Sequence, residues 1–338
     1  MKYYLAPMEG ITGYVFRRAQ RDFFAPFDKY MTPFLAPNRN RCMNARERKD
    51  VQPEHNQGAV TVPQILANQS EVFLRTAEEL AALGYEELNL NLGCPSGTVT
   101  AKGRGAGFLA RPKELERFLA EIFAHTRQRI SVKTRLGVEE AEEFETILEI
   151  YNRYPLTELI IHPRVQQDFY RRKPNLTAFA KALACCRHPV CYNGDLFTVR
   201  DLQQFRRQFP QVERVMLGRG AIVNPGFLNL LAQGAAADQE SENVPEQGKR
   251  TEAMGSDLAQ RLRAFHDRIL ADYERELCGE RNVLFKMKEL WFYMIRLFPD
   301  SEKEAKQIKK VQHLYVYREL VAHLFAQKEP RAPSQLEF

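Results

Sequence analysis

The sequence predicts an α/β protein: a (β/α)8 barrel of the TIM type, followed by a small all-α helical bundle. Two observations predict the barrel. Strand-like and helix-like segments alternate over residues 1–232, and polar side chains follow most of the strand-like segments. A third observation predicts the bundle, because residues 257–328 have helical periodicity throughout. With 338 residues and 44% hydrophobic content, the chain is long enough for one large domain and one small one.

Short runs of apolar or β-branched residues are the expected strands. They cover residues 3–6, 29–32, 60–66, 87–91, 130–134, 159–162, 189–193 and 214–218. Helical patterns lie between most of them, at residues 70–83, 112–125, 139–151, 198–209 and 220–231. Strands that alternate with helices pair in parallel through right-handed crossovers, and eight such units close most economically into a barrel.

A polar segment marks the expected end of the barrel. Residues 233–256 are rich in Ala, Gln, Glu and Gly and contain almost no large apolar residue, which is typical of a linker. We therefore expect a catalytic barrel at 1–232, a linker at 233–256, a helical domain at 257–328 and a frayed tail at 329–338.

Composition and charge narrow the class of protein. The net charge is +6, with 49 Lys and Arg against 43 Asp and Glu, which suits an anionic partner. The six cysteines form no CxxC pair and have no regular spacing, so we expect neither a metal site nor a disulfide framework. There is no signal-peptide core and no membrane-length apolar run, and the expected location is the cytoplasm.

Chemically capable side chains follow the expected strands at the ends that form the active face of barrel enzymes. In chain order these are Pro7 and Met8, Thr32, Gln64, Asn91 with Cys94, Lys133 with Arg135, His162 with Arg164, Asn193 with Asp195, and Gly218 with Arg219. Each has an ordinary structural explanation when taken alone. Their accumulation at one predicted edge favours an active site there.

The loops after the last two strands have the form of a phosphate site. Glycines beside Arg219 allow backbone amides and a guanidinium to approach phosphate oxygens, and residues 193–195 precede them on the neighbouring strand. Together with Lys133 and Gln64, this indicates a phosphorylated ring cofactor. FMN fits, and pyridoxal phosphate stays open on spacing alone. Cys94 could act as a general acid or as a nucleophile.

Two loops on the predicted active face combine basic and other polar residues. Residues 34–58 form an insertion rich in Arg, and the loop after the sixth strand contains Arg164, Arg171, Arg172 and Lys173 beside two aromatic residues, Phe169 and Tyr170. Such a mixture can hold phosphates and stack on bases, although a solvated loop is the usual explanation.

The motifs in this order resemble those of the tRNA-dihydrouridine synthase family, in its FMN-dependent bacterial form. They lie at residues 6–12 (APMEGIT), 91–95 (NLGCP), 102–107 (KGRGAG), 133–135 (KTR), 161–162 (IH), 192–195 (YNGD) and 216–220 (MLGRG). The resemblance covers residues 1–325 approximately. Its NxGCP and GRG motifs are highly specific when they occur together.

The resemblance implies an FMN-containing barrel with a helical RNA-binding domain. The implied reaction is NADPH-dependent reduction of the C5–C6 double bond of uridine in tRNA, with hydride passing from the flavin to C6. Cys94 resembles the proton donor to C5. Pro7, Met8, Gln64, Lys133 and His162 match flavin-contacting positions, and Asn193, Asp195, Gly218 and Arg219 match phosphate positions. Implied substrate contacts are Asn91, Arg104, Arg164, Arg171 and Arg172.

The chain departs from the family pattern at several positions. Gly13 stands where an Asp is usual, Pro163 follows His162, and the insertion at residues 34–58 is unusually rich in Arg. We expect a monomer that binds tRNA and no membrane. The alternative function is an FMN-dependent oxidoreductase of a small free pyrimidine or another small unsaturated substrate. A non-catalytic RNA-binding protein on a barrel scaffold is a third hypothesis.

Overall fold

The structure of the protein is a computed structural model that describes residues 1–232 and 247–331, with side chains of the second range described from Asp257 onward. The chain divides into two compact units. The first comprises Met1–Glu9, Asp28–Asp195 and Phe209–Leu217. The second comprises Gly10–Phe27, Leu196–Gln208 and the described part of Gly218–Phe338.

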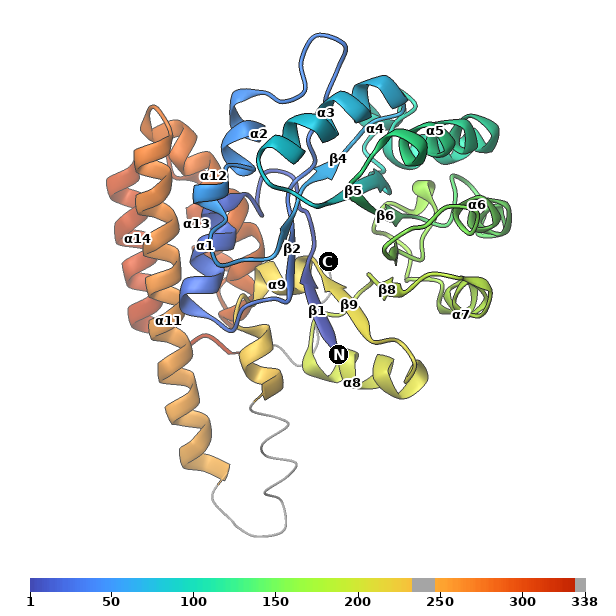
Figure 1. The fold of residues 1–338 in the computed structure, drawn as a ribbon. Coiled ribbons are helices and arrows are strands. Elements are labelled where there is room, and N and C mark those ends of the chain that lie inside the picture. The colour runs from blue at the N-terminus through green and yellow to red at the C-terminus, as the bar shows by residue number, and fades with distance from the viewer. Residues whose placement is uncertain (233–246, 332–338) are drawn as a thin grey trace. The chain divides into compact units, whose positions relative to one another are not determined.

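The strands of the described residues form one parallel sheet in the first unit (Figure 1). They are β1 (Lys2–Leu5), β2 (Lys29–Met31), β3 (Thr61–Val62), β4 (Gln64–Ile65), β5 (Glu87–Leu92), β6 (Arg129–Thr134), β7 (Leu159–Ile161), β8 (Val190–Tyr192) and β9 (Arg214–Leu217). Their order is β3-β2-β1-β9-β8-β7-β6-β5-β4. The two edge strands, β3 and β4, are separated in the chain by one residue, so the sheet curls into a nearly closed barrel. The predicted fold class is confirmed.

Pro63 explains why the expected strand at residues 60–66 is observed as two. Proline has no N–H to donate, so the strand is interrupted there. β3 pairs with β2 on one side, and β4 pairs with β5 on the other. A bridge between Leu35 and Ile65 spans the remaining gap, where the Leu35 N–H donates to the Gln64 carbonyl at 2.7 Å.

Helices of the first unit cover the outside of the sheet, where α3, α5, α6 and α7 follow one another around the barrel (Figure 1). The helices are α2 (Ala45–Asp50), α3 (Ser70–Ala82), α4 (Gly97–Thr100), α5 (Pro112–His125), α6 (Glu143–Tyr151) and α7 (Leu176–Cys185). Short 3-10 turns are η1 (Pro53–His55), η2 (Gly105–Ala110) and η3 (Gln166–Asp168). The amphipathic patterns predicted from sequence therefore bury their apolar faces against the sheet.

The amino ends of the strands are held by buried ion pairs. The Lys29 Nζ lies 2.8 Å from Glu87 Oε1 and 2.6 Å from Glu158 Oε1, and it also lies over the ring of Tyr4. Charges taken out of water are tolerated when they are paired in this way. Above this cluster the barrel interior is filled by a buried group made of Tyr4, Ala6, Met31, Val62, Ile160, Cys191 and Met216. This end of the barrel is therefore closed, which leaves the carboxyl ends of the strands for chemistry.

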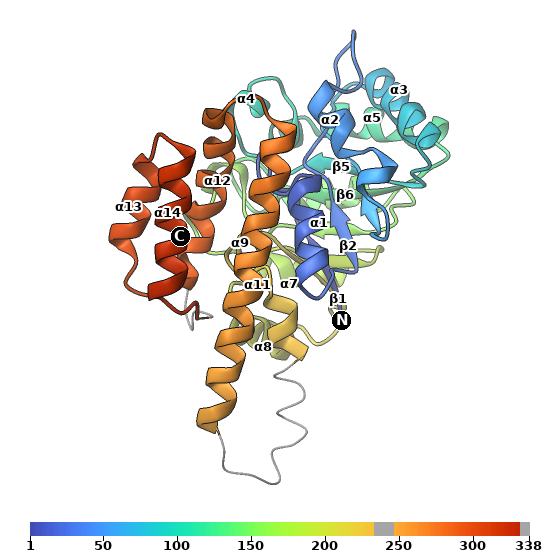
Figure 2. The same ribbon diagram turned by 90° about the vertical axis from the view of Figure 1, so that its left-hand side faces the viewer.

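The second unit consists of helices. They are α1 (Tyr14–Phe23), α8 (Val199–Gln208), α9 (Arg219–Val223), α11 (Gln247–Glu276), α12 (Glu280–Met294), α13 (Glu302–Lys310) and α14 (Leu314–Gln327), with the 3-10 turn η4 (Ile295–Leu297) after α12. The rings of Phe16 and Phe24 on and after α1 pack edge-on against Phe265 of α11. α11 to α14 form the bundle predicted after the barrel (Figure 2).

The expected domain boundaries stay a prediction. Of the segment expected as a linker, residues 233–246 lie outside the described residues, and α11 begins at Gln247. In the expected tail, the Arg331 N–H donates to the Leu297 carbonyl at 2.7 Å, and residues 332–338 lie outside the described residues. Among the helices that the structure describes, none combines the length and apolarity needed to cross a membrane.

Candidate active site

A chain of buried amide side chains crosses the barrel interior at β4, β5 and β6. The Asn91 Nδ2 donates to Gln64 Oε1 at 2.7 Å, and the Gln64 Nε2 donates to Asn89 Oδ1 at 2.7 Å. The Asn89 Nδ2 then donates to Ser131 Oγ at 2.9 Å. Each amide orientation is set by its neighbour, so Gln64 and Asn91 are fixed before any ligand binds.

Asn91 also shapes the turn that carries Cys94. Its Oδ1 accepts the backbone N–H groups of Gly93 at 3.1 Å and Cys94 at 3.0 Å. The Cys94 carbonyl in turn accepts the Ala106 N–H at 3.0 Å. The amide oxygen of Asn91 therefore holds the root of the loop, and its expected contact with a target base stays a prediction.

The Cys94 thiol is partly exposed and has a raised pKa. Burial is the main cause, and it outweighs the Ser96 N–H and the positive charges of Lys133 and Arg135, which lower the pKa. A thiol with a raised pKa keeps its proton at neutral pH. Of the two roles left open by the sequence, this favours the proton donor, because a nucleophile needs the thiolate.

Lys133 lies beside Asn91 in the register of β5 and β6. Burial and the charge of Arg135 lower its pKa to about 8. Within the described residues its ammonium group has no hydrogen bond and no ion pair. A poorly solvated cation without an acidic partner suits a ligand that is anionic or becomes anionic. This unmatched charge fits a flavin, whose ring gains negative charge when it is reduced.

The sequence placed Arg135 with Lys133 at a strand end of the predicted active edge but gave Arg135 no role in the site. It is fully buried and donates to three backbone carbonyls, from Nε to Gly93 at 3.0 Å, from Nη1 to Val165 at 2.8 Å and from Nη2 to Phe169 at 2.7 Å. It thereby ties the Cys94 loop to the loop after β7. Its position two residues after Lys133 was the available signal, but its carbonyl partners leave no side-chain pattern in the sequence.

Arg164 is buried in a network with His162 and Asp195. Its Nη1 and Nη2 donate to the Asp195 carboxylate at 2.9 and 2.6 Å, and Nη1 lies 2.8 Å from His162 Nε2. A guanidinium has no acceptor, so His162 Nε2 must accept and the ring proton lies on Nδ1. Arg164 was expected to contact RNA. Its bonds here are internal, including one from Nε to the Arg172 carbonyl at 2.6 Å.

The basic and aromatic loop after β7 carries the exposed candidates. Arg171 and Arg172 are both exposed, and Phe169 and Tyr170 are 39% and 45% exposed. Phe169 has a φ of 49°, a left-handed conformation that is unusual for a bulky residue and occurs often at functional sites. The Arg171 guanidinium lies over the Phe169 ring, 5.8 Å from its centroid.

The remaining candidates are placed as follows. Pro7 and Met8 follow β1, Asn193 follows β8 and donates from Nδ2 to the Met216 carbonyl at 2.9 Å, and Arg104 precedes η2. Gly218 and Arg219 belong to the second unit, where the Arg219 guanidinium lies 4.9 Å from the Phe197 ring centroid. Asn193 and Asp195 belong to the first unit, so a phosphate site shared by the four residues stays a prediction.

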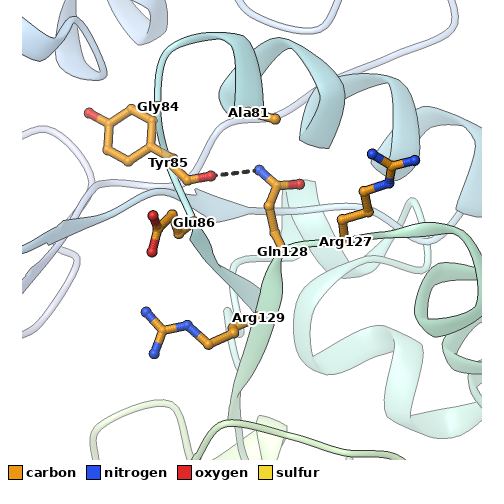
Figure 3. Close-up of a pocket in the computed structure, with 7 residues that line it drawn as sticks. All are labelled: Ala81, Gly84, Tyr85, Glu86, Arg127, Gln128 and Arg129. Atoms are coloured by element: carbon orange, nitrogen blue, oxygen red, sulfur yellow. Dashed lines mark hydrogen bonds between the residues drawn. The ribbon is translucent and has the colours of Figure 1, made fainter.

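A hollow of about 580 Å³ lies at the amino ends of β5 and β6, opposite the ends that carry the candidate active site (Figure 3). It is lined by Ala81, Gly84, Tyr85, Glu86, Arg127, Gln128 and Arg129. Glu86 precedes β5 and Arg129 begins β6, whereas Cys94 and Lys133 lie at or beyond the carboxyl ends of these strands. This hollow is therefore separate from the candidate active site.

Comparisons with known proteins agree with the motifs. The family model described as "Dihydrouridine synthase (Dus)" matches residues 4–312. A tRNA-dihydrouridine(16) synthase of Cupriavidus necator is 30% identical over 322 residues, covering 91% of this chain and 92% of the relative. A protein of the same name from Ralstonia nicotianae is 29% identical over 336 residues, covering 95% of each chain.

Solved structures show similarity of fold. Histamine dehydrogenase from Rhizobium sp. 4-9 aligns with a TM-score of 0.54 at 11% identity, covering 69% of this chain and 46% of that one. A 2-naphthoyl-CoA reductase aligns with a TM-score of 0.53 at 9% identity, covering 69% of this chain and 50% of that one. At these identities the alignments show similarity of fold alone.

Proposed function

This chain belongs to the dihydrouridine synthase family, and on that premise we propose that it reduces the C5–C6 double bond of specific uridines in tRNA to 5,6-dihydrouridine. FMN is the proposed cofactor and NADPH the proposed reductant. The observation that carries the proposal is that Cys94, just after β5, and Lys133, near the end of the neighbouring strand β6, lie at the same edge of the barrel.

Several residues of the first unit would hold the cofactor. Lys133 offers a cation to the ring. The family resemblance assigns Gln64 and His162 to the same site, where Gln64 is fully buried and fixes Asn91, and Arg164 holds His162. Pro7 and Met8 are assigned to the same site by the family resemblance. When bound, FMN supplies the hydride that reaches C6 of the uracil ring.

Cys94 completes the reduction by giving its proton to C5. The hydride and the proton together saturate the double bond, and the thiolate left on Cys94 takes a proton back from solvent. Asn91 and Arg135 position the Cys94 loop, as their bonds to its backbone indicate. The target uridine must leave its stack to reach this edge, so an RNA with an accessible loop is the expected substrate.

The test of the reaction is nucleoside mass spectrometry on tRNA lacking dihydrouridine, incubated with the purified protein and NADPH or NADH. A nucleoside two hydrogens heavier than uridine supports the proposal. Uridine 16 is the first position to map, since the names of both relatives specify it. Consumption of NADPH without an RNA product would instead support reduction of a small free substrate.

The Cys94→Ala variant tests the proton donor. We expect turnover to fall by about 10²- to 10⁴-fold while flavin and tRNA binding are retained. Because the donor must carry its proton, wild-type turnover should fall as pH rises through the Cys94 pKa, and burial should move this fall above the pH of an ordinary thiol. Cys278→Ala is the matched control, since that thiol is exposed. Unchanged dihydrouridine formation by Cys94→Ala would exclude this role.

A further inference from the structure

α12 has an apolar inner face and an unusual outer face. The inner face buries Val283, Leu284, Met287, Leu290, Trp291 and Met294 among the neighbouring helices. On the opposite side, Arg281, Phe285, Lys288 and Phe292 follow one another at helical spacings of four, three and four residues. Arg296 continues this line in η4. We call these five residues the outer stripe.

The two phenylalanine rings of the outer stripe are largely open to solvent. Phe285 is 60% exposed and Phe292 is 61% exposed, although α12 already has a complete buried face. Each ring has a cation over it, Lys286 at 5.6 Å from the Phe285 centroid and Arg296 at 5.1 Å from the Phe292 centroid. The rings therefore contribute little to the core, and each is held on the surface by a cation–π contact.

The arrangement of the stripe favours RNA over an apolar protein surface. Lys288 separates the two rings, and Arg281 and Arg296 flank them, so there is no continuous apolar patch along the stripe. Lys288 and Arg296 are half-buried and donate to the carbonyls of Val311 and Phe292, whereas Arg281 is exposed. An apolar partner would still have to cover all three charges without supplying a counter-charge. An RNA strand supplies base faces that can stack on the two rings and phosphates that can pair with the cations.

We propose that the outer stripe of α12 binds an unpaired segment of the substrate RNA by stacking one base on Phe285 and another on Phe292. This inference rests on the proposed function, since it takes the same RNA as partner. Seven residues of helix separate the rings by about 10 Å along the axis, so each ring takes its own base. Arg281 and Arg296 hold the adjoining phosphates.

A third exposed ring lies near the amino end of α12. Tyr315 is 64% exposed and stacks with His313, 5.8 Å between centroids. Glu280, the first residue of α12, accepts the Leu314 N–H at 3.0 Å and so holds the start of α14 beside this end. The aromatic surface thus continues beyond the stripe in the direction of Arg281.

The test compares tRNA binding by variants that separate stacking from apolar contact. Fluorescence anisotropy with an unmodified tRNA transcript and the holoenzyme should show affinity weakened about 5- to 100-fold for Phe285→Ala and for Phe292→Ala. Phe→Leu variants should lose as much as the Ala variants, because leucine keeps apolar area but has no ring. Phe→Trp variants should bind at least as tightly as wild type. Val60→Ala, at another exposed apolar residue, is the matched control.

Three results would overturn the inference. One is full affinity in the Phe285→Ala, Phe292→Ala double variant, and another is full affinity in the Leu variants. The third is a wild-type dimer, seen by sedimentation, that the double variant abolishes, since the stripe would then be an interface between two copies. Flavin content and dihydrouridine formation measured on the same samples separate this outcome from failure of the proposed function, which wild type would show by binding RNA without converting it.

Discussion

Replacing Lys133 should have opposite effects on the stability of the fold and on cofactor binding. Its pKa in the folded chain is about 8, against an ordinary value of 10.5, so below pH 8 the fold carries the cost of a poorly solvated cation. Lys133→Met keeps the length of the side chain without the charge. At pH 7 and without flavin, the free energy of unfolding of this variant should exceed that of wild type by about 1 to 3 kcal/mol, whereas its affinity for flavin should be lower.

The stability advantage of Lys133→Met over wild type should decrease as pH rises. Between pH 8 and 10.5 the unfolded chain holds more protons at this position than the folded chain, so wild-type stability rises with pH and the advantage of Lys133→Met shrinks. Denaturant unfolding of both proteins at pH 7 and pH 10 measures this. A variant that is less stable than wild type at pH 7 would show that the ammonium is well solvated.

Arg164 fixes the tautomer of His162, and this can be observed directly. Nitrogen-15 NMR of wild type should show His162 with its proton on Nδ1, because Nε2 accepts from the Arg164 guanidinium. In Arg164→Gln the constraint is lost and both tautomers should be populated. Asp195→Asn is the companion variant, since it loosens Arg164 without touching the ring. A proton on Nε2 in wild type would contradict the network.

At the scale of elements, the turn into η2 depends on a glycine. Gly105 has a φ of +56°, and a Cβ there would lie 2.7 Å from the Cys94 carbonyl oxygen and 3.1 Å from the Cys94 Cβ. Gly105→Ala should therefore displace the Cys94 loop, lowering stability by about 1 to 3 kcal/mol and turnover at least tenfold. Gly97→Ala, with no atom within 4 Å of its Cβ, is the control and should be near neutral in turnover and thermal unfolding.

The same elements show what a sequence can and cannot predict. Alternating strands and helices predicted the barrel, and the strand ends predicted the edge where Cys94, Gln64 and Lys133 are now found. The split of one strand at Pro63 follows from a local rule, that proline interrupts a strand, but the apolar run at residues 60–66 predicts a single strand. The roles of Arg135 and Arg164 depend on carbonyls and side chains that lie up to 42 residues away in the chain, and contacts of this kind leave no periodic signal.

At the scale of the whole molecule, the net charge of +6 raises the question of whether RNA binding follows total charge or its placement. If phosphates contact the exposed loop after β7, Arg171→Gln with Arg172→Gln should make the slope of log affinity against log salt shallower by about 1 to 2. Arg206→Gln with Arg207→Gln removes the same charge from the exposed side of α8 and is the matched control. Equal changes in both double variants would mean that only the total charge matters. A change confined to the first would assign the phosphate contacts to the loop beside the candidate active site.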